Sequence, residues 1–131
     1  PVIQMAALEA ALKIWGEVDM KCFRQQAKKL TSLFIKAIED LGLDLKLLSP
    51  KNPCYRASQV SFKTSNAYEK MQSLIDNGVI GDYREPDIMR FGFNPLFNSE
   101  SDSIGAAKKL ALIIKESSWK NKKYTKRNLV T

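Results

Sequence analysis

The sequence predicts an α/β fold class: a two-layer sandwich in which helices pack on one face of a small, mostly antiparallel sheet. Its 131 residues match the size of one domain. The chain is 44% hydrophobic and 27% charged, which is the balance of a globular protein rather than a disordered one. Segments with helical spacing of apolar residues are interspersed with short segments in which apolar and polar residues alternate. Together these patterns predict about four helices and about four strands.

Two leading helices are predicted within residues 1–42. Apolar residues at helical spacing predict a first helix that Gly16 interrupts. Asp19 is placed to cap a longer second helix, and Gly42 is placed to end it. The second helix has one apolar stripe, which is expected to face the core: Phe23, Ala27, Leu30, Phe34, Ile38 and Leu41.

The rest of the sandwich is predicted within residues 43–118. Apolar runs, alternation and turn residues predict strands at residues 45–48, 58–63, 79–83 and 87–93. Further helices are predicted at residues 65–78 and 100–116. The buried face of the last helix is expected to carry Ile104, Ala107, Leu110, Ala111 and Ile114.

The composition excludes several kinds of site. The chain has no histidine, which removes Ser–His and Cys–His nucleophile pairs, a His general base and an HExxH zinc site. Cys22 and Cys54 form no CxxC motif, so we expect reduced thiols, no metal site and a cytoplasmic protein. No apolar run approaches the roughly 18–20 residues of a membrane span. The first residue is Pro1 rather than Met, so we expect the chain to be cut from a longer one.

The net charge of +7 is concentrated near the C-terminus. Residues 119–131 contain five basic residues and no acidic one, whereas the other 118 residues contain 16 basic and 14 acidic ones. Blocks of like charge tend to stay disordered, so residues 119–131 are expected to form a flexible basic tail. The alternative is that this tail holds an anionic partner, such as RNA or a lipid surface.

The predicted strand at residues 87–93 (DIMRFGF) carries the strongest candidate for a binding residue. Its alternation places Met89, Phe91 and Phe93 on the face that packs against helices, and Arg90 with Gly92 on the other. Gly92 leaves space for a molecule to approach Arg90. Two interpretations stay open from the pattern alone. Arg90 is either an ordinary solvent-facing or ion-paired arginine, or a guanidinium that binds a carboxylate or phosphate.

Other polar residues are weaker candidates. Arg56, Ser58 and Gln59 lie where a loop enters a predicted strand, so they could line a cleft or satisfy backbone atoms. Arg84 is a further possible cleft-lining residue near the turn before the DIMRFGF strand. The carboxylates in this region are expected to form a solvated hairpin tip: Asp82, Glu85 and Asp87.

Two segments resemble the C-terminal region of the kynureninase family. They are RASQVSF at Arg56–Phe62 and GVIGDYREPDIMRFGFNPLF at Gly78–Phe97. The family pattern is approximately R-G-S-Q-V-S, then G-V-I-G-D-x-R-x-P-D-x-x-R-F-G-F-x-P-L-Y. The opening PVIQMAALEAALKIWGEVDM is similar to the family segment P-x-x-x-x-A-A-L-x-A-x-L. The resemblance covers nearly all of residues 1–119, with Ala57 in place of the usual Gly and Phe97 in place of the usual Tyr.

The resemblance implies a fold, a reaction and a cofactor. Kynureninases are pyridoxal-phosphate enzymes of the aspartate-aminotransferase fold type, usually homodimers. They hydrolyse the small-molecule substrate L-kynurenine, or 3-hydroxykynurenine, to anthranilate or its hydroxy form and L-alanine. Residues 1–118 would be the small C-terminal domain. The Schiff-base lysine and the cofactor-binding residues would lie in the large N-terminal domain, so no catalytic or cofactor-binding residue is expected here.

The resemblance also assigns a role to Arg90. In the family, the arginine of R-F-G-F binds the α-carboxylate of the substrate, and this arginine corresponds to Arg90. The domain alone is expected to be inactive, and to expose an apolar patch where the large domain packs. One alternative is the small domain of another pyridoxal-phosphate enzyme of the same fold type, similar to an aminotransferase or a cysteine desulfurase. The second is a basic nucleic-acid-binding module, which the nearly neutral body of the chain disfavours.

Overall fold

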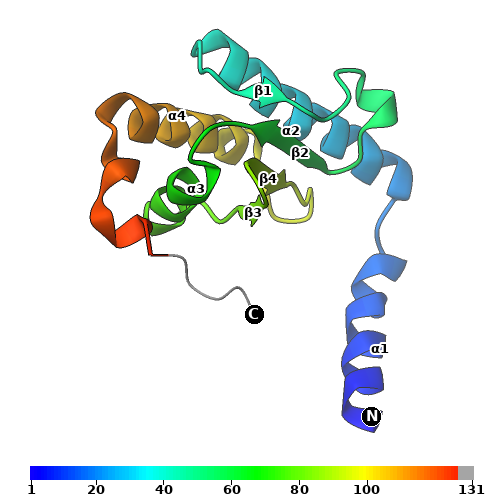
Figure 1. The fold of residues 1–131 in the computed structure, drawn as a ribbon. Coiled ribbons are helices and arrows are strands. Elements are labelled where there is room, and N and C mark those ends of the chain that lie inside the picture. The colour runs from blue at the N-terminus through cyan, green and yellow to red at the C-terminus, as the bar shows by residue number, and fades with distance from the viewer. Residues whose placement is uncertain (127–131) are drawn as a thin grey trace.

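A computed structural model describes residues 1–126 of the chain. Within these residues, four strands form one antiparallel sheet in the order β1-β2-β4-β3, and helices cover one of its faces (Figure 1). The helices are α1 (Val2–Gly16), α2 (Met20–Asp40), α3 (Ala67–Asp76) and α4 (Glu100–Glu116). The strands are β1 (Lys46–Leu47), β2 (Gln59–Lys63), β3 (Asp82–Arg84) and β4 (Ile88–Gly92). The predicted two-layer α/β sandwich is therefore confirmed.

Helix α2 begins and ends close to where the sequence predicts. The Asp19 carboxylate accepts hydrogen bonds from the backbone N–H groups of Lys21 (2.8 Å) and Cys22 (3.2 Å), which satisfies two of the free donors at the helix start. Gly42 follows the helix with a φ of +64°, a conformation that glycine adopts without strain. The predicted stripe is buried except at its ends. Phe23 is half-buried and Leu41 is 42% exposed, because the helix ends at Asp40 and Leu41 turns away from the core.

The core lies between α2, α3, α4 and the inner face of β2 and β4. Phe34 of α2 is fully buried, and its ring centroid lies 4.8 Å from that of Phe91 and 5.2 Å from that of Phe93. Val60 and Phe62 of β2 complete the apolar face of the sheet. This face confirms the alternation predicted for both central strands.

The buried face of α4 agrees with the prediction at Ala107 and Leu110 and differs elsewhere. Its buried residues are Ser103, Ala107, Leu110 and Ile113. The predicted residues Ile104, Ala111 and Ile114 are only half-buried. The fully buried Ser103 and Ala107 are small, which lets the start of α4 approach α2 closely, and Leu110 and Ile113 continue the buried row.

The strand predicted at residues 79–83 begins only at Asp82. Gly78 has a φ of +78° and donates its N–H to the carbonyl of Ile75 (2.9 Å), while Val79 donates to Leu74 (3.1 Å). This pair of bonds is the Schellman arrangement that closes a helix. Val79 therefore belongs to the end of α3 and is not free to pair as a strand residue.

Residues just beyond α4 fold onto α3. Ser118–Lys120 and Lys122–Tyr124 form 3-10 turns. Tyr124 is buried, and its hydroxyl lies 3.0 Å from the carboxylate of Asp76, which also forms a 2.6 Å ion pair with Lys123. The sequence predicts that residues 119–124 start a flexible tail. In the structure the contacts of Lys123 and Tyr124 with Asp76 hold this segment against the domain. Residues 127–131 of the predicted tail lie outside the described residues.

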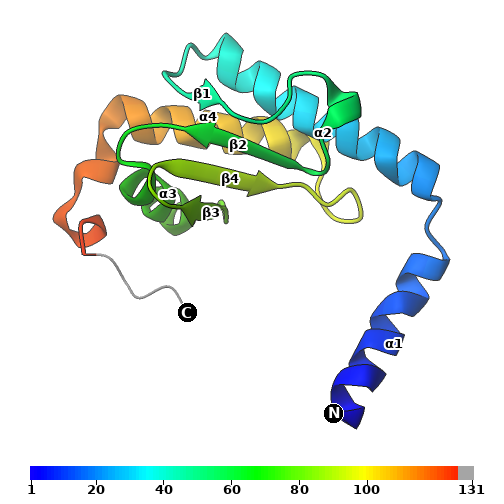
Figure 2. The ribbon, with the colours of Figure 1, turned by 45° about the vertical axis from the view of Figure 1, so that its right-hand side comes forward.

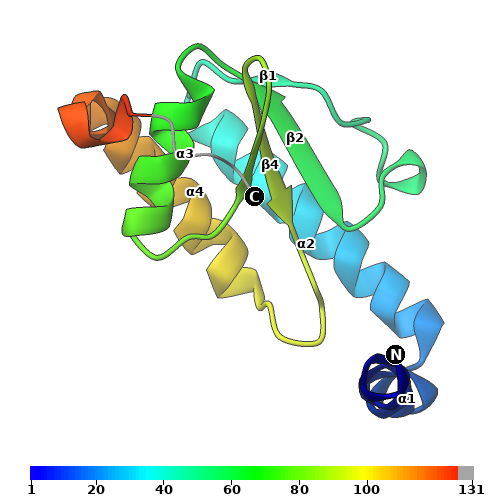
Figure 3. The same cartoon turned by 60° about the horizontal axis from the view of Figure 1, so that its bottom comes forward.

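Helix α1 stands apart from the sandwich. Figure 2 shows it leaving the start of α2 and pointing away from the sheet, and Figure 3, which looks nearly along α1, shows it beyond the N-terminal end of α2. Its apolar side chains contact little of the domain: Val2 and Ile3 are each 85% exposed. No helix among the described residues is both long enough and apolar enough to span a membrane.

Candidate functional site

Arg90 lies in the middle of the sheet face that the helices leave uncovered. Met89 and Phe91, its neighbours in β4, are buried on the helix side, so the alternation places Arg90 on the opposite face. The strand register sets Arg90 opposite Ser61 of β2 on one side and Asp82 of β3 on the other. The side chain of Arg90 is 32% exposed, so it is sheltered but accessible.

Asp82 connects the two arginines of this face. Its Oδ2 atom accepts hydrogen bonds from Nε of Arg90 (3.0 Å) and Nε of Arg84 (3.0 Å), and it also forms an ion pair with Nη2 of Arg90. The expected place of Asp82 at a solvated hairpin tip is wrong, because the tip is formed by residues 85–87. In the register of β3 and β4, Arg84 pairs with Ile88 next to the tip. Two residues further along, Asp82 pairs directly with Arg90.

A shallow hollow of about 430 Å³ lies over this part of the sheet. Residues 48–50, which follow β1, form one wall, and Ser61, Arg84, Ile88 and Arg90 form the rest. The Ser49 hydroxyl accepts a hydrogen bond from the backbone N–H of Ser61 (2.9 Å), which fixes this wall to β2. The two arginines of the lining and the adjacent Asp82 carboxylate together carry a formal charge of +1.

One edge of the Arg90 guanidinium remains available in this hollow. Nη1 of Arg90 makes no hydrogen bond with any of residues 1–126, and it is not a buried atom. A guanidinium with a free edge can donate two parallel hydrogen bonds to a carboxylate or phosphate. The geometry therefore leaves Arg90 able to bind an anion while it keeps its ion pair with Asp82.

The other sequence candidates divide into two groups. Gln59 and Gly92 face each other across β2 and β4 on the same side as Arg90, and Gln59 donates to the Ser61 hydroxyl (3.2 Å). A Cβ added at Gly92 would meet no atom within 4 Å, so the space beside Arg90 is open there. Ser58 instead supports the sheet, because its carbonyl accepts from the N–H of Phe93 (2.8 Å).

Arg56 does not line the hollow. It is 3% exposed, and Nη1 donates to the carbonyls of Pro50 (2.7 Å) and Lys51 (3.0 Å), while Nη2 donates to the Ser32 hydroxyl (2.9 Å). Burial lowers the pKa of this guanidinium, and the nearby positive charge of Arg24 lowers it further. Arg56 therefore ties the loop after β1 to α2, which is a structural role.

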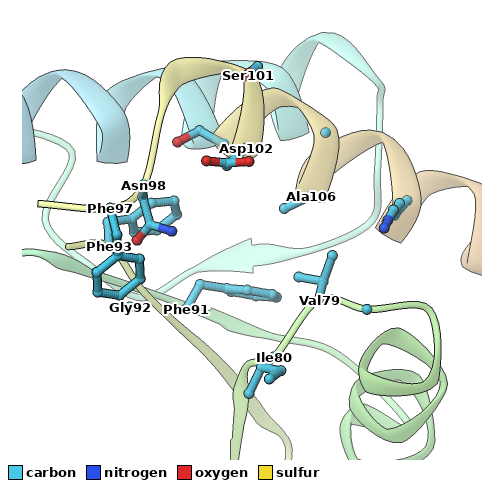
Figure 4. A pocket seen from close by; sticks show the side chains of 14 residues that line it. Val79, Ile80, Phe91, Gly92, Phe93, Phe97, Asn98, Ser101, Asp102 and Ala106 are labelled. Atoms are coloured by element: carbon cyan, nitrogen blue, oxygen red, sulfur yellow. The ribbon is translucent and has the colours of Figure 1, made fainter. Parts of the chain in front are cut away.

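A second, larger groove of about 650 Å³ was not anticipated from the sequence. Figure 4 shows it between Phe91 at the end of β4 and Phe93 just after this strand on one side, and the first turns of α4, with Asp102 and Ala106, on the other. The Asp102 carboxylate accepts from the N–H of Ser99 (2.7 Å), and this bond lowers the pKa of Asp102. Its carboxylate thus caps α4, and the remaining walls are mostly apolar. The sequence carries only a weak signal for this groove, because its lining residues come from three separate segments, 78–80, 91–93 and 97–109, which meet only in the folded domain.

The buried Lys70 of α3 lies apart from the hollow. Among the described residues it is the only buried lysine. Its Nζ donates to the hydroxyl of Thr64 (2.8 Å) and lies 5.3 Å from the centre of the Trp119 ring. Burial lowers the pKa of Lys70, and the charges of Asp44 and Glu69 oppose that shift. Because Lys70 lies in the helical layer, the sheet separates it from Arg90.

Comparisons with known proteins agree on one family. The model of the family described as "Kynureninase C-terminal domain" matches residues 23–110. The kynureninase of Burkholderia mallei (strain SAVP1) is 38% identical over 133 residues, which cover 100% of this chain and 32% of that protein. The kynureninase of Pseudomonas fluorescens is similar to the same extent, with 38% identity over 133 residues. The chain thus spans about a third of the length of the curated relatives it matches.

Proposed function

The chain belongs to the kynureninase family, as its C-terminal domain, and from this premise we propose that it binds the substrate carboxylate in a kynureninase. The complete enzyme would hydrolyse L-kynurenine, or 3-hydroxykynurenine, to anthranilate or 3-hydroxyanthranilate and L-alanine. Pyridoxal phosphate, held by the large domain, would supply the electron sink for this chemistry. The observation that carries the proposal is the free guanidinium edge of Arg90 on the open face of the sheet.

Arg90 would bind the α-carboxylate of the substrate in this reaction. Two parallel hydrogen bonds from its free edge would fix both the position and the plane of the carboxylate. Fixing that group also fixes the directions of the other bonds at the substrate Cα, which brings the reacting atoms into place without a further loss of entropy. Gln59, Ser61, Arg84 and Gly92 would form the surroundings of the bound carboxylate, and the +1 charge of the hollow would attract it.

The partner of this domain would be the large domain of the same enzyme, within a homodimer. Helix α1 supports this proposal because its apolar residues surround most of the helix, with Glu9 and Lys13 as its charged residues. A helix that is apolar on nearly all sides is normally buried. Leu8 and Leu12 are 50% and 55% exposed here, so α1 has an apolar surface that the described domain leaves uncovered. Because the large domain would also hold pyridoxal phosphate, the small domain alone would be inactive.

The test uses the full-length enzyme that carries this domain, with L-kynurenine as substrate. Replacing Arg90 by Lys keeps the positive charge but removes the planar pair of donors. Loss of such a contact is expected to lower kcat/KM by about 30-fold or more, since truncating one partner of a bound charge pair costs on the order of 2–5 kcal/mol. The matched control is Lys36→Gln on α2, whose exposed ion pair with Asp40 lies on another surface.

The outcomes of this test separate the candidates. Anthranilate release by the parent enzyme, with strong loss in Arg90→Lys and none in Lys36→Gln, supports the proposal. Near-normal turnover in Arg90→Lys would remove Arg90 from the site. Transamination or desulfuration without anthranilate release would instead favour a related enzyme of the same fold type.

A further inference from the structure

We propose that Asp82 is a positioning residue for Arg90, and that it sets which edge of the guanidinium meets the ligand. This inference rests on the proposed role of Arg90 and goes beyond it. An arginine can offer a carboxylate either its side edge, formed by Nε and one terminal nitrogen, or its end, formed by both terminal nitrogens. Asp82 takes the side edge, so the end of Arg90 is left for the substrate carboxylate.

The contacts of Asp82 account for this orientation. Its Oδ2 accepts from Nε of Arg90 at 3.0 Å and forms an ion pair with Nη2, whereas Nη1 has no partner among residues 1–126. An arginine side chain has several rotatable bonds and is costly to immobilise on ligand binding. Because Asp82 already holds one edge, less of that freedom remains to be lost when a carboxylate binds.

Asp82 is itself held from two directions. The first is its backbone, which pairs with Arg90 in the β3–β4 register and follows Gly81, a residue packed tightly against Met71. The second is Arg84, whose Nε donates to the same Oδ2 at 3.0 Å. A carboxylate fixed by both backbone and side-chain contacts can define the position of another group, as a supporting residue of a binding site must.

The charges are consistent with a positioning role. Asp82 alone would neutralise Arg90 and weaken its attraction for an anion. Arg84 adds a second positive charge, so that Asp82, Arg84 and Arg90 together keep a formal charge of +1. The orientation of Arg90 is therefore fixed without cancelling the attraction of the hollow for a carboxylate.

A contribution to folding stability is a poor explanation for this ion pair. The side chains of Arg90 and Asp82 are 32% and 43% exposed. Ion pairs with this exposure contribute little to stability, because water and salt screen them. Removing Asp82 is therefore expected to change substrate recognition much more than the midpoint of thermal unfolding.

The test is a double-mutant cycle in the full-length enzyme. Asp82→Ala, Arg90→Ala and the double variant are compared on L-kynurenine and on its α-carboxamide, which lacks the charged carboxylate. Asp82→Ala is expected to lower kcat/KM for L-kynurenine by about tenfold to 100-fold, the effect of a misplaced binding group. It should lower kcat/KM for the carboxamide much less, and add no further loss when Arg90 is already alanine.

Two further variants keep the test decisive. Asp82→Asn retains an oxygen that can accept the same hydrogen bonds, so it should recover part of the preference for L-kynurenine over the carboxamide. Asp87→Ala is the matched control. Asp87 lies at the tip of the same hairpin and pairs with Lys63 (3.1 Å) instead of with an arginine of the hollow. Thermal unfolding of each variant shows whether it is folded.

Each outcome bears on one proposal or on both. Equal losses from Asp82→Ala with and without Arg90, or equal losses on the two substrates, would overturn the positioning role and leave the role of Arg90 intact. If Arg90→Ala leaves the preference for L-kynurenine unchanged, the proposed function of Arg90 fails, and the role of Asp82 fails with it.

Discussion

Gly81 lies directly against the backbone carbonyl of Arg90. A Cβ built on Gly81 would stand 2.9 Å from that oxygen, and 2.7 Å from the end of the Met71 side chain. The end of the Met71 side chain is flexible and can move, but the carbonyl belongs to β4, one of the two central strands of the sheet, and cannot. The close approach of these two residues therefore fixes how β3 enters the sheet, one residue before Asp82.

Gly81→Ala is accordingly expected to push β3 away from β4. The strain should lower the free energy of unfolding by about 1–3 kcal/mol, the usual effect of overpacking. Denaturant unfolding of the 131-residue chain measures this change. Gly92→Ala is the matched control for stability, because a Cβ there meets no atom within 4 Å. Equal stability of the two variants would contradict the proposed constraint at Gly81.

Arg84→Gln tests the charge balance of the hollow. The change removes one positive charge and leaves Asp82 to neutralise Arg90. We expect KM for L-kynurenine in the full-length enzyme to rise by about two- to fivefold, which corresponds to an exposed charge contact of about 0.5–1 kcal/mol. The difference from the parent enzyme should shrink as ionic strength rises. A KM that matches the parent at both low and high salt would show that Arg84 does not serve the hollow.

The exposed apolar residues of α1 predict self-association of the domain without its partner. The 131-residue chain should form oligomers as its concentration rises, because contiguous apolar surface associates. Replacing both Leu8 and Leu12 by Glu should keep it monomeric in sedimentation experiments. Leu112→Glu is the control, since Leu112 is 53% exposed but lies on α4. A chain that is monomeric at every concentration would argue against α1 as an interaction surface.

The contact of Asp76 with the C-terminal turns predicts a pH dependence. Hydrogen bonds from Lys123 and Tyr124 hold the pKa of Asp76 below its usual 3.8, so the stabilisation is present above that value and lost as the pH falls further. The same contacts raise the pKa of Lys123 from 10.5 to about 12, with Asp76 as the main cause. That stabilisation is complete below pH 10.5 and is lost as the pH rises toward about 12.

Trp119 fluorescence, recorded in a Trp15→Phe background, reports on these turns. The signal should be constant between these limits and change below about pH 4 and above about pH 11. In Asp76→Asn the acid transition should disappear and the turns should be loosened at every pH. Asp40→Asn, which removes an exposed i, i+4 pair on α2, should behave as the parent chain does. An acid transition that persists in Asp76→Asn would assign the change to another group.

The sequence predicts those elements whose signals are local. Helix α4 has the predicted bounds because Ser99 and Asp102 form a capping box at its start, and β4 alternates as expected because Met89 and Phe91 must reach the core. The start of β3 was missed because the cap of α3 competes for Val79. The buried face of α4 was rotated because the fit of small residues against α2 is a tertiary property.

The candidate site was predicted only in part, because some of its contacts depend on tertiary structure. The strand period and the family resemblance both pointed to Arg90. The contact between Asp82 and Arg90 could not be inferred from spacing alone, because these two residues meet only through the register of two strands. The sequence left two roles open for Arg56, lining a cleft or satisfying backbone atoms. It could not decide between them because the partners of Arg56, Ser32 and the carbonyls of residues 50 and 51, come together only when the loop folds onto α2.

The pair of guanidinium groups that share one carboxylate has a practical consequence for assays of this family member. Asp82 contacts both Arg84 and Arg90. If their donors bind a substrate carboxylate as proposed, they should also bind small polyvalent anions, including the buffer ions phosphate, sulfate and citrate. Such ions would compete with an amino-acid substrate for the same donors and inflate its apparent KM. Kinetic constants measured in amine-based buffers of matched ionic strength would be free of this inhibition.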